Sequence, residues 1–510
     1  MYPRACDINP MTKELAAATH FSAADLHDRL KGCRIVKDAA YKDLTVEHLL
    51  CQASRASLVS KSFRREVYFL DAPVGKFFLK ISPLSHKKDR RRFLMLPWRI
   101  GTEWRNLYRL EKKSVAAPKR VFFGYKGRYP CRGFFLVTED VGGTGIDCRN
   151  PGHMFRLADY LAVLHAKGVY HRDLHPGNIL IDRSGQPVLL DAQEVYFFPW
   201  LPHGLRLRNL GRLWRYIHFL YSSTVDLDAF LAVYNSGRKT AVAAADVMAF
   251  AVRFQEQYYA SRAKRCFKNS SEFKVVKNGR GVKGFERRDF QWGKDDLQAA
   301  LSHGEYIKDE KLIAYGDVCI KIHDKRFFHK NRCLKCWQMA RALAVRGVNG
   351  PKALAYYAAG GCAYFLMVYY RDSIKLNAYL SALYDQGQRR AAIRRLADWV
   401  RTCHDLNIWQ RDFKSSNVLV LAEQFMMVDL EGVRLCRRLS WRRRVFNLAQ
   451  LNASVSHALT IKDRLRFFYF YCRGRLPSVK KRRKAYQRIW RIAQKKNTLP
   501  FGLDLERLSL

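Results

Sequence analysis

The feature that most limits the possible folds of this chain is a motif that occurs twice. It reads YHRDLHPGNILI at residues 170–181 and WQRDFKSSNVLV at residues 409–420. Asp173 and Asp412 align at an offset of 239 (412 − 173), and two upstream histidines, His165 and His404, keep the same offset. A register kept over such a distance is typical of an internal repeat. The sequence therefore predicts a duplicated domain.

The order of local patterns is the same in both halves. Short aromatic and β-branched runs between residues 57 and 82 favour a β-hairpin ending at Lys80, and Trp104, Leu107 and Leu110 then recur at helical spacing. A further strand pair and a series of helices follow, with the repeated motif between them. We therefore expect an α+β fold with two tandem domains, each a lobe of about five strands followed by a helical lobe.

The chain length of 510 residues allows two domains, each large enough to bury its own core. We expect residues 1–55 to form an N-terminal extension and residues 56–262 to form the first domain. Residues 263–284 are basic and contain glycines, which predicts a linker, and residues 285–510 then form the second domain.

The charge of the chain is strongly unbalanced. It has 92 Lys and Arg against 45 Asp and Glu, a formal net charge of +47. Basic runs occur at residues 87–92, 437–444 and 480–484; one such run is usually a solvated face, but together they favour a polyanionic partner. A nucleic acid, an anionic leaflet and a phosphorylated glycolipid would all fit. No nucleic-acid recognition motif accompanies the charge, so we do not expect a nucleic acid.

The sequence has no apolar run of the roughly 18 residues that a membrane span needs, and its N-terminus has no apolar core of a secretory signal. We expect a cytoplasmic or peripheral protein. The 13 cysteines follow no framework and predict reduced thiols. Cys333 and Cys336, with His329 nearby, have a metal-like spacing, but without a second pair ordinary helix cysteines are favoured over zinc.

The first copy of the motif carries the groups that phosphoryl transfer needs. Asp173 is the candidate catalytic base, and Asn178 and Asp191 supply oxygen ligands for Mg²⁺. Upstream, Lys80 would hold the phosphates, and Glu103 would pair with that lysine. An Asp-x4-Asn pattern followed across a hairpin by another Asp is a specific signal of phosphoryl transfer, because it aims a base and two metal ligands at one point.

The second copy keeps most of these groups. Lys321, Asp412, Asn417 and Asp429 correspond to Lys80, Asp173, Asn178 and Asp191, in that order, with Asp412 as its candidate base, Lys321 as its phosphate-binding lysine, and Asn417 and Asp429 as its Mg²⁺ ligands.

Three positions of the second copy differ. Aligning Trp104 with Trp337 puts Cys336 at the position of Glu103, and Gln410 replaces His171. Lys414 follows Asp412 and could neutralise the transferred phosphate. We expect the first domain to be active and the second to be partly degenerate, and its turnover stays open.

Both copies depart from ordinary protein kinases. A Gly-x-Gly-x-x-Gly loop is missing from the sequence, so Ser60, Lys61 and Ser62 would have to cover the phosphates. Asp191 is not followed by Phe-Gly, and no Ala-Pro-Glu ends an activation segment. The role of His175 is left open between a contact to the acceptor or γ-phosphate and a structural hydrogen bond.

These residues resemble the bacterial lipopolysaccharide kinase family, whose members phosphorylate heptose or Kdo in the inner core of the glycolipid. The resemblance rests on GVYHRDLHPGNIL with VLLDAQEV, on NIWQRDFKSSNVLV with MVDLEGVRL, on TEWRNLYRL before VAAPKRVFFGY, and on DRLRFFYFYCRG. The HPGN segment alone is shared with aminoglycoside, choline and quinone-biosynthesis kinases.

The resemblance implies two protein-kinase-like domains that use ATP and Mg²⁺ to phosphorylate a sugar hydroxyl at the cytoplasmic face of the inner membrane. Its partners would be the nascent core glycolipid and the anionic membrane surface, held by basic loops such as residues 87–92 and 437–444. Oligomeric state is not predicted.

Two alternatives remain. An aminoglycoside- or choline-type kinase lines its acceptor site with acid for a cationic substrate, which the charge of +47 argues against. A pseudokinase scaffold would bind an anionic partner without turnover, which the complete set of residues in the first domain argues against.

Overall fold

A computed structural model describes residues 23–495 apart from positions 52–54, 62–64, 85–86, 128–130, 222, 224, 239, 278–282, 293–294, 309–310, 325–330, 456–458 and 474–477. The chain divides into two compact units, unit 1 (Met1–Glu256) and unit 2 (Gln257–Leu510). Each unit has an antiparallel sheet followed by a helical lobe, so the predicted α+β class and the duplication are confirmed.

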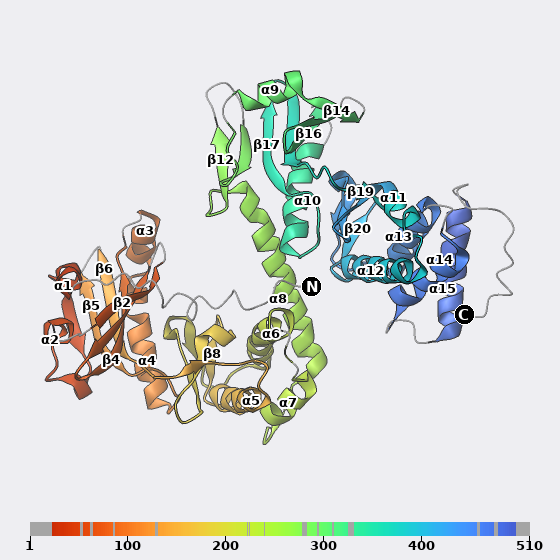
Figure 1. The fold of residues 1–510 in the computed structure, drawn as a ribbon. Helices are drawn as coiled ribbons and strands as arrows, with labels where there is room; N and C mark the ends of the chain where they lie inside the picture. The colour runs from red at the N-terminus through yellow and green to blue at the C-terminus, as the bar shows by residue number, and fades with distance from the viewer. Residues whose placement is uncertain are drawn as a thin grey trace. The chain divides into compact units, whose positions relative to one another are not determined.

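The N-terminal lobe of unit 1 is a six-stranded antiparallel sheet (Figure 1). In sheet order its strands are β1 (Arg34–Lys37), β5 (Arg120–Lys126), β6 (Gly133–Glu139), β4 (Gly75–Ser82), β3 (Glu66–Ala72) and β2 (Arg55–Lys61). Successive side chains of a strand point to opposite faces. Lys80 on β4 therefore lies on the face opposite to Leu79 and Ile81.

Helices cover both faces of this sheet (Figure 1). They are α1 (Ala23–Leu30), α2 (Val46–Cys51) and α4 (Thr102–Lys112). On the α1 and α2 side, Leu26 and Leu49 are fully buried in one core with Leu79. On the other side, Leu107 and Leu110 of α4 join a separate core. Lys80 consequently shares a sheet face with α4.

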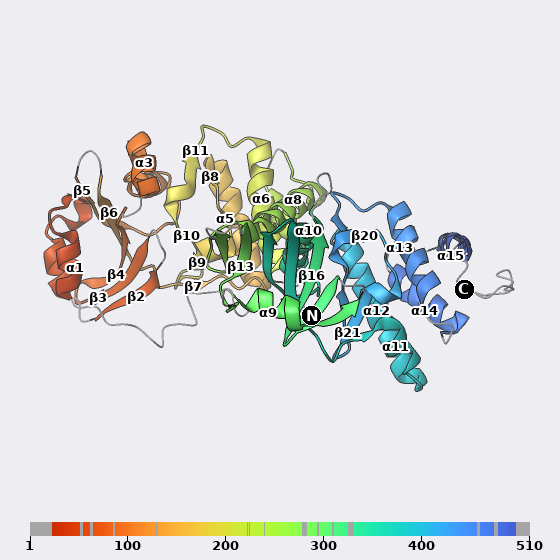
Figure 2. The same ribbon diagram turned by 90° about the horizontal axis from the view of Figure 1, so that it is seen from above.

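The C-terminal lobe of unit 1 is helical and contains short hairpins. Its elements are β7 (Thr144–Gly145), α5 (Pro151–Ala166), β8 (Val169–His171), η4 (Pro176–Asn178), β9 (Ile179–Ile181), β10 (Pro187–Leu189), η5 (Ala192–Glu194), β11 (Val195–Phe197), α6 (His203–Phe219), α7 (Leu227–Asn235) and α8 (Ala244–Ala263), the last of which crosses into unit 2. Strands β9 and β10 lie beside α5 (Figure 2). The first copy of the motif thus forms β8, η4 and β9, and the predicted hairpin at residues 182–187 is confirmed.

Unit 2 repeats this plan with a seven-stranded sheet. In sheet order the strands are β12 (Phe273–Lys277), β13 (Lys283–Arg287), β17 (Ala353–Ala359), β18 (Cys362–Val368), β16 (Val318–Asp324), β15 (Leu312–Tyr315) and β14 (Glu305–Lys308). Helix α10 (Arg332–Val345) packs on one face, where Trp337 is fully buried. Helix α9 (Asp296–His303) packs on the other face with Ala300 against Ile313 and Ile320. Lys321 on β16 faces α10, as Lys80 faces α4.

The helical lobe of unit 2 also follows that of unit 1. Its elements are β19 (Ile374–Lys375), α11 (Leu376–Ser381), α12 (Gln386–Asp405), β20 (Ile408–Gln410), η7 (Ser415–Asn417), β21 (Val418–Leu421), β22 (Gln424–Met427), η8 (Leu430–Gly432), β23 (Val433–Leu435), α13 (Trp441–Ser454), α14 (Ile461–Cys472) and α15 (Val479–Gln494). Buried Tyr471 on α14 and Trp490 on α15 belong to the same core as the motif strands β20 and β21.

Three segments differ from the sequence-based expectations. The described part of the expected extension, residues 23–51, supplies α1, β1 and α2 to the lobe of unit 1, because its leucines complete the core. The expected linker, residues 263–284, holds β12 and the start of β13, since buried Phe273 packs against Trp337. Residues 87–92 lie in helix α3 (Lys87–Met95) and not in a loop. With β1 the sheet of unit 1 has six strands, and with β12 and β13 the sheet of unit 2 has seven, so both exceed the expected five.

Two observations concern membranes and metals. Within the described ranges, no helix combines the length and the apolar character needed to cross a bilayer. Cys333 and Cys336 are buried on α10, where the Cys333 thiol contacts the carbonyl oxygens of Lys321 and Ala363 at 3.3 Å. His329, the third residue of the metal-like spacing, lies outside the described residues.

Candidate active site

The predicted lysine and glutamate of unit 1 meet between sheet and helix. The Lys80 ammonium lies 2.5 Å from a carboxylate oxygen of Glu103, and both side chains are mostly buried. Strand β4 presents the lysine toward α4, and Glu103 sits in the first turn of that helix. The pair fixes where the ammonium points, as binding of phosphates requires.

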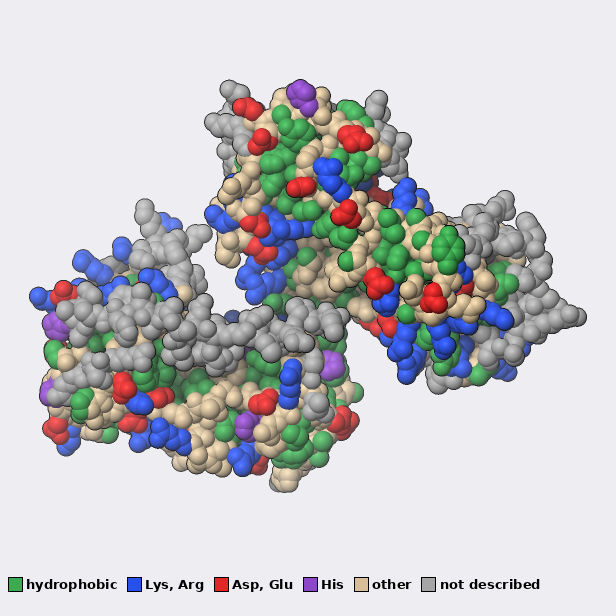
Figure 3. All heavy atoms as spheres, in the orientation of Figure 1, with side chains coloured by type: hydrophobic (Ala, Val, Ile, Leu, Met, Phe, Trp, Pro, Cys, Tyr) green, Lys and Arg blue, Asp and Glu red, His purple; other side chains and the backbone are tan. Residues whose placement is uncertain are grey.

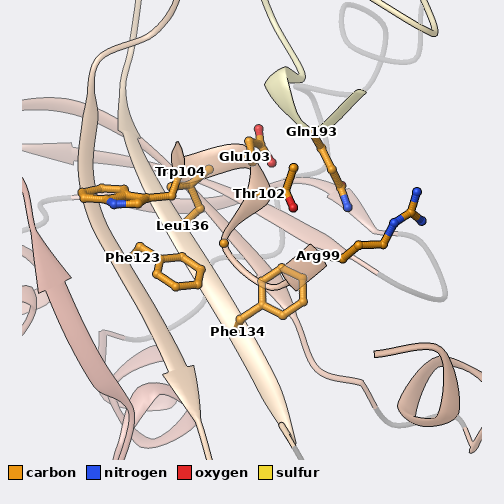
Figure 4. Close-up of a pocket in the computed structure, with 9 residues that line it drawn as sticks. Arg99, Thr102, Glu103, Trp104, Phe123, Phe134, Leu136 and Gln193 are labelled. Atoms are coloured by element: carbon orange, nitrogen blue, oxygen red, sulfur yellow. The ribbon is translucent and has the colours of Figure 1, made fainter. Parts of the chain in front are cut away.

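Helix α4 is also tied to the loop after Asp191. The amide nitrogen of buried Asn106 donates to the carbonyl oxygens of Ala192 and Val195 at 2.8 and 2.9 Å. Beside this junction lies a small pocket, with Glu103, Thr102 and Gln193 along one side and Phe123 and Phe134 on the other (Figure 4). The helix that holds Lys80 and the turn that follows Asp191 are thus parts of one site.

The catalytic loop of unit 1 is held by a buried network of hydrogen bonds. Nε2 of His171 contacts the carbonyl oxygens of Leu190 and Asp191 at 3.3 and 3.2 Å. Asn209 on α6 donates to the His171 carbonyl at 2.6 Å. Burial lowers the pKa of His171 more than the nearby Asp191 raises it, so the ring is neutral at pH 7. His171 therefore supports the loop and does not react.

Asp173, Asn178 and Asp191 converge on this loop. The Asn178 amide nitrogen donates to the Asp173 carbonyl at 2.9 Å, which leaves its oxygen Oδ1 for a metal ion. Asp191 has a left-handed backbone with φ of 52°, a conformation that Asp tolerates better than most residues and that is often kept at functional sites. Amide and carboxylate oxygens suit Mg²⁺. The donor set therefore fits the metal ion that the sequence predicted.

Two arginines that the sequence did not single out enter this site. Arg212 on α6 lies 3.1 Å from an oxygen of the exposed Asp173 carboxylate. Arg65, just before β3, donates to Gln193 at 2.6 Å and lies 3.5 Å from Asp191 and 3.8 Å from Glu103. Arg65 follows the segment expected to cover the phosphates, of which Ser60 and Lys61 lie on β2 and Ser62 is outside the described residues.

His175 has a structural contact in this loop. Its Nδ1 accepts a hydrogen bond from the Gly177 amide at 3.1 Å, and its ring lies 5.2 Å from that of Tyr216. Burial lowers the pKa of His175 more than Asp173 raises it, so the ring is neutral at pH 7 and can accept. The contact favours the structural role, and contact with an acceptor stays a hypothesis.

In unit 2 the lysine pairs with a different carboxylate. Lys321 lies 2.7 Å from Glu431 on η8 and 3.2 Å from Asp429. Cys336 occupies the helix position of Glu103, as aligned, and burial raises the pKa of its thiol, which therefore stays neutral. A neutral thiol cannot form the ion pair that Glu103 forms, but Lys321 has another carboxylate partner in Glu431. The sequence signal was Glu431 in MVDLEGV opposite Gln193 in LLDAQEV.

Gln410 takes over the contact of His171. Its Nε2 donates to the Asp429 carbonyl at 2.9 Å, and Asn447 donates to the Gln410 carbonyl at 2.6 Å, as Asn209 does in unit 1. A Cβ at Gly432 would stand 1.9 Å from Oε1 of Gln410, so the longer amide needs a glycine there. Gln410 therefore supports the loop of unit 2 in place of the histidine.

The remaining predicted residues of unit 2 also converge. Asn417 donates to the Asp412 carbonyl at 2.8 Å, and Asp429 has a φ of 53°. Lys414 lies 2.8 Å from the Asp412 carboxylate. Gln450, which aligns with Arg212, instead bonds to the backbone at Arg411 and Phe413. The cation beside the candidate catalytic aspartate thus comes from a helix in unit 1 and from the loop in unit 2.

Two known proteins are similar to parts of this chain. A segment of 98 residues is 36% identical to the serine/threonine-protein kinase pkn2 of Myxococcus xanthus, covering 17% of this chain and only 11% of that protein. Among solved structures, the chain is similar to a type VIII aminoglycoside-3'-phosphotransferase, with 18% identity, 45% of this chain and 96% of that chain covered, and a TM-score of 0.29.

The family comparison covers both units. The family model described as "Lipopolysaccharide kinase (Kdo/WaaP) family" matches residues 51–234 and 320–471, which together are more than half of the chain. Each matched range contains a copy of the motif with its lysine, aspartates and asparagine. The chain therefore belongs to the lipopolysaccharide kinase (Kdo/WaaP) family.

Proposed function

We propose that this protein transfers the γ-phosphate of ATP to a hydroxyl of heptose or Kdo in the inner core of lipopolysaccharide, and that unit 1 carries this activity. The observation that carries the proposal is the set of Lys80, Glu103, Asp173, Asn178 and Asp191 within one unit of a chain from this family. Use of ATP follows from the family, whereas the sugar and its hydroxyl belong to the proposal.

The proposed reaction uses the side chains as follows. Asp173 orients the sugar hydroxyl and takes its proton, while the hydroxyl oxygen bonds to the γ-phosphorus and the bond to the β-phosphate oxygen breaks, releasing ADP. Lys80, held by Glu103, binds the phosphates. Asn178 and Asp191 would hold Mg²⁺, which neutralises phosphate charge when bound. Arg212 holds the Asp173 carboxylate in place.

The positive surface charge supports the proposal that the protein acts on a glycolipid within an anionic membrane leaflet. Lys and Arg side chains form groups on the visible face of each unit (Figure 3). Helix α15 buries Tyr486, Ile489 and Trp490 and exposes a row of basic residues: Lys480, Lys481, Arg483, Lys484, Arg488 and Arg491. A helix of this kind is attracted to anionic lipid. We therefore propose peripheral binding at the cytoplasmic face of the inner membrane.

The test is phosphorylation of defined glycolipid. Purified wild-type protein, ATP and Mg²⁺ are incubated with core glycolipid lacking inner-core phosphate, and the product is analysed by mass spectrometry. We expect the mass of one added phosphate on heptose or Kdo, and fragmentation names the sugar. An Asp173→Asn/Asp412→Asn double variant should leave the glycolipid unchanged.

Two controls separate the alternatives. Kanamycin and choline are offered in place of glycolipid, and phosphorylation of either one without any of the glycolipid would overturn the assignment. Binding of ATP with no phosphorylation of any acceptor would indicate a pseudokinase scaffold. Exposed Glu423, which pairs with Arg395 away from the catalytic loop, offers a matched control, and Glu423→Gln should keep full activity.

A further inference from the structure

We propose that unit 2 is a second nucleotide-binding site, in which Glu431 replaces the missing helix glutamate as the carboxylate that orients Lys321. The inference rests on the proposed function, because it assigns to unit 2 the same ligand, ATP with a divalent cation. It goes further in naming a residue that the family pattern of helix glutamate and strand lysine does not contain. Four observations support it.

The first observation is geometric. Lys321 lies 2.7 Å from Glu431, and Lys80 lies 2.5 Å from Glu103. The environments also match, since the lysine side chains are 23% and 21% exposed and the glutamates 18% and 13%. The two ammonium groups therefore have equivalent partners, although one partner comes from a helix and the other from the turn after Asp429.

The second observation is a pair of compensating replacements. The helix position is Glu103 in unit 1 and neutral Cys336 in unit 2. The turn position is neutral Gln193 in unit 1 and Glu431 in unit 2. Each unit thus has one carboxylate in these two positions. A mostly buried lysine needs carboxylate partners, and beside Asp429 the second carboxylate compensates for the loss of the first.

The third observation concerns the two carboxylates beside Lys321. The Lys321 ammonium lies 2.7 Å from Glu431 and 3.2 Å from Asp429, so both carboxylates reach it. If Asp429 binds a metal ion, its carboxylate is no longer available to the lysine. Glu431 then keeps the ammonium in position while Asp429 serves the cation, which is the division of roles that Glu103 and Asp191 have in unit 1.

The fourth observation is that the turn carrying Glu431 is held against α10. Lys335 donates to the Glu431 backbone carbonyl, and Arg332 lies 3.6 Å from the Glu431 carboxylate. In unit 1 the corresponding connection between helix and turn is made by Asn106. Both units therefore hold this turn against the helix. In unit 2 these contacts fix the position of Glu431.

The experiment measures ATP binding by the full chain. A Lys80→Ala/Asp191→Ala variant removes the site of unit 1, and titration calorimetry with ATP and Mg²⁺ then counts the remaining sites. We expect one site per chain. Adding Glu431→Gln should weaken binding about ten-fold, the worth of one charged hydrogen bond. Adding Glu423→Gln instead should leave the affinity unchanged.

Restoring the carboxylate on the helix is the decisive variant. Cys336→Glu, added to Glu431→Gln in the same background, should recover most of the lost affinity. That recovery distinguishes a positioning role from general damage to the fold, and thermal unfolding of each variant checks the fold independently. No recovery by a folded variant, or no effect of Glu431→Gln, would overturn the role of Glu431.

The outcomes also separate this inference from the proposed function. If wild-type protein binds one ATP and the Lys80→Ala/Asp191→Ala variant binds none, unit 2 is not a nucleotide site, while the proposed function of unit 1 stands. If wild-type protein binds no ATP at all, both proposals fail.

Discussion

Units 1 and 2 share one architecture but hold their charged groups in different ways. Lys80 pairs with a glutamate on a helix, whereas Lys321 pairs with a glutamate on the turn after Asp429. The candidate catalytic aspartates differ likewise, with a helix arginine beside Asp173 and a loop lysine beside Asp412. A role can therefore persist after its residue has moved to another element.

Two kinds of buried contact are the same in both units. His165 and His404 each contact a tyrosine hydroxyl at 2.8 Å, and Asn209 and Asn447 each donate to the loop backbone at 2.6 Å. Buried polar groups must be satisfied, so a change at one of them is costly. The ion pairs of Asp173 and Asp412 are more open to water and contribute less, so the two units can supply that cation from different positions. The mostly buried lysine of each unit keeps a glutamate partner, although the glutamate stands on a different element.

The largest expected effect separates the two units by activity. Asp173→Ala should lower the rate of glycolipid phosphorylation about 10³-fold, because it removes the proton acceptor. Asp412→Ala alone should have a much smaller effect, and the double variant should be inactive. Initial rates of phosphate incorporation test this order. A greater loss from Asp412→Ala would reverse the assignment of the main catalytic unit.

Moving the carboxylate within unit 1 tests the comparison directly. Glu103→Cys should lower activity roughly 10- to 100-fold, since a charged hydrogen bond is worth about 1.5 to 3 kcal/mol. Gln193→Glu, which gives unit 1 the residue of unit 2, should recover part of that loss. Steady-state kinetics should show the change mainly in the KM for ATP. If the double variant is no better than Glu103→Cys, the two positions are not interchangeable.

The cation beside the catalytic aspartate can be exchanged in the same way. Arg212→Gln introduces the residue of unit 2 and should lower kcat about ten-fold, because the Asp173 carboxylate loses a partner at 3.1 Å. His175→Lys places a lysine where unit 2 has Lys414 and should restore part of the rate. An unchanged kcat in Arg212→Gln would show that the aspartate needs no cation.

Stability should reveal the coupling between Gln410 and Gly432. Gly432→Ala should destabilise unit 2 by about 2 kcal/mol, because the new Cβ overlaps the Gln410 side chain. Gln410→His, the residue of unit 1, should relieve part of this cost. Denaturant unfolding of the single and double variants measures the coupling, and additive effects would contradict it.

The smallest expected effect is a pH dependence of unit 1. The pKa of His171 is lowered in the folded state, chiefly by burial, from about 6.5 in the unfolded chain. Its contribution to stability is therefore complete above pH of about 6.5 and is lost as the pH falls through the folded-state value. Between pH 7.5 and 5 the free energy of unfolding should therefore fall less in His171→Gln than in the wild-type protein. An equal loss in wild type and variant would exclude His171 as its source.

The sequence predicted much of the fold because the same order of patterns occurs in both copies, so each copy supports the assignment of the other. The strands with Lys80 and Lys321, the helix after Lys80 and the hairpin after Asn178 all lie where periodicity placed them. The packing of residues 23–51 and 273–277 onto the sheets was not predicted, since short amphipathic segments show a core contact only when the sheet is present.

The ion pairs were harder to predict than the motif. Lys80 with Glu103 follows from a known spacing, but Arg212 and Glu431 reach the site from elements whose distance from it depends on the tertiary fold. The alignment did contain a signal at Glu431, because a neutral residue stands opposite it in the first copy. A carboxylate that appears beside a lost carboxylate is worth testing as its replacement.

The most direct test of the account is the number of ATP molecules that the wild-type chain binds in the presence of Mg²⁺. Titration calorimetry should give two per chain, falling to one in Lys80→Ala/Asp191→Ala and to one in Lys321→Ala/Asp429→Ala. One ATP per wild-type chain, lost entirely in either variant, would contradict two sites of equivalent construction.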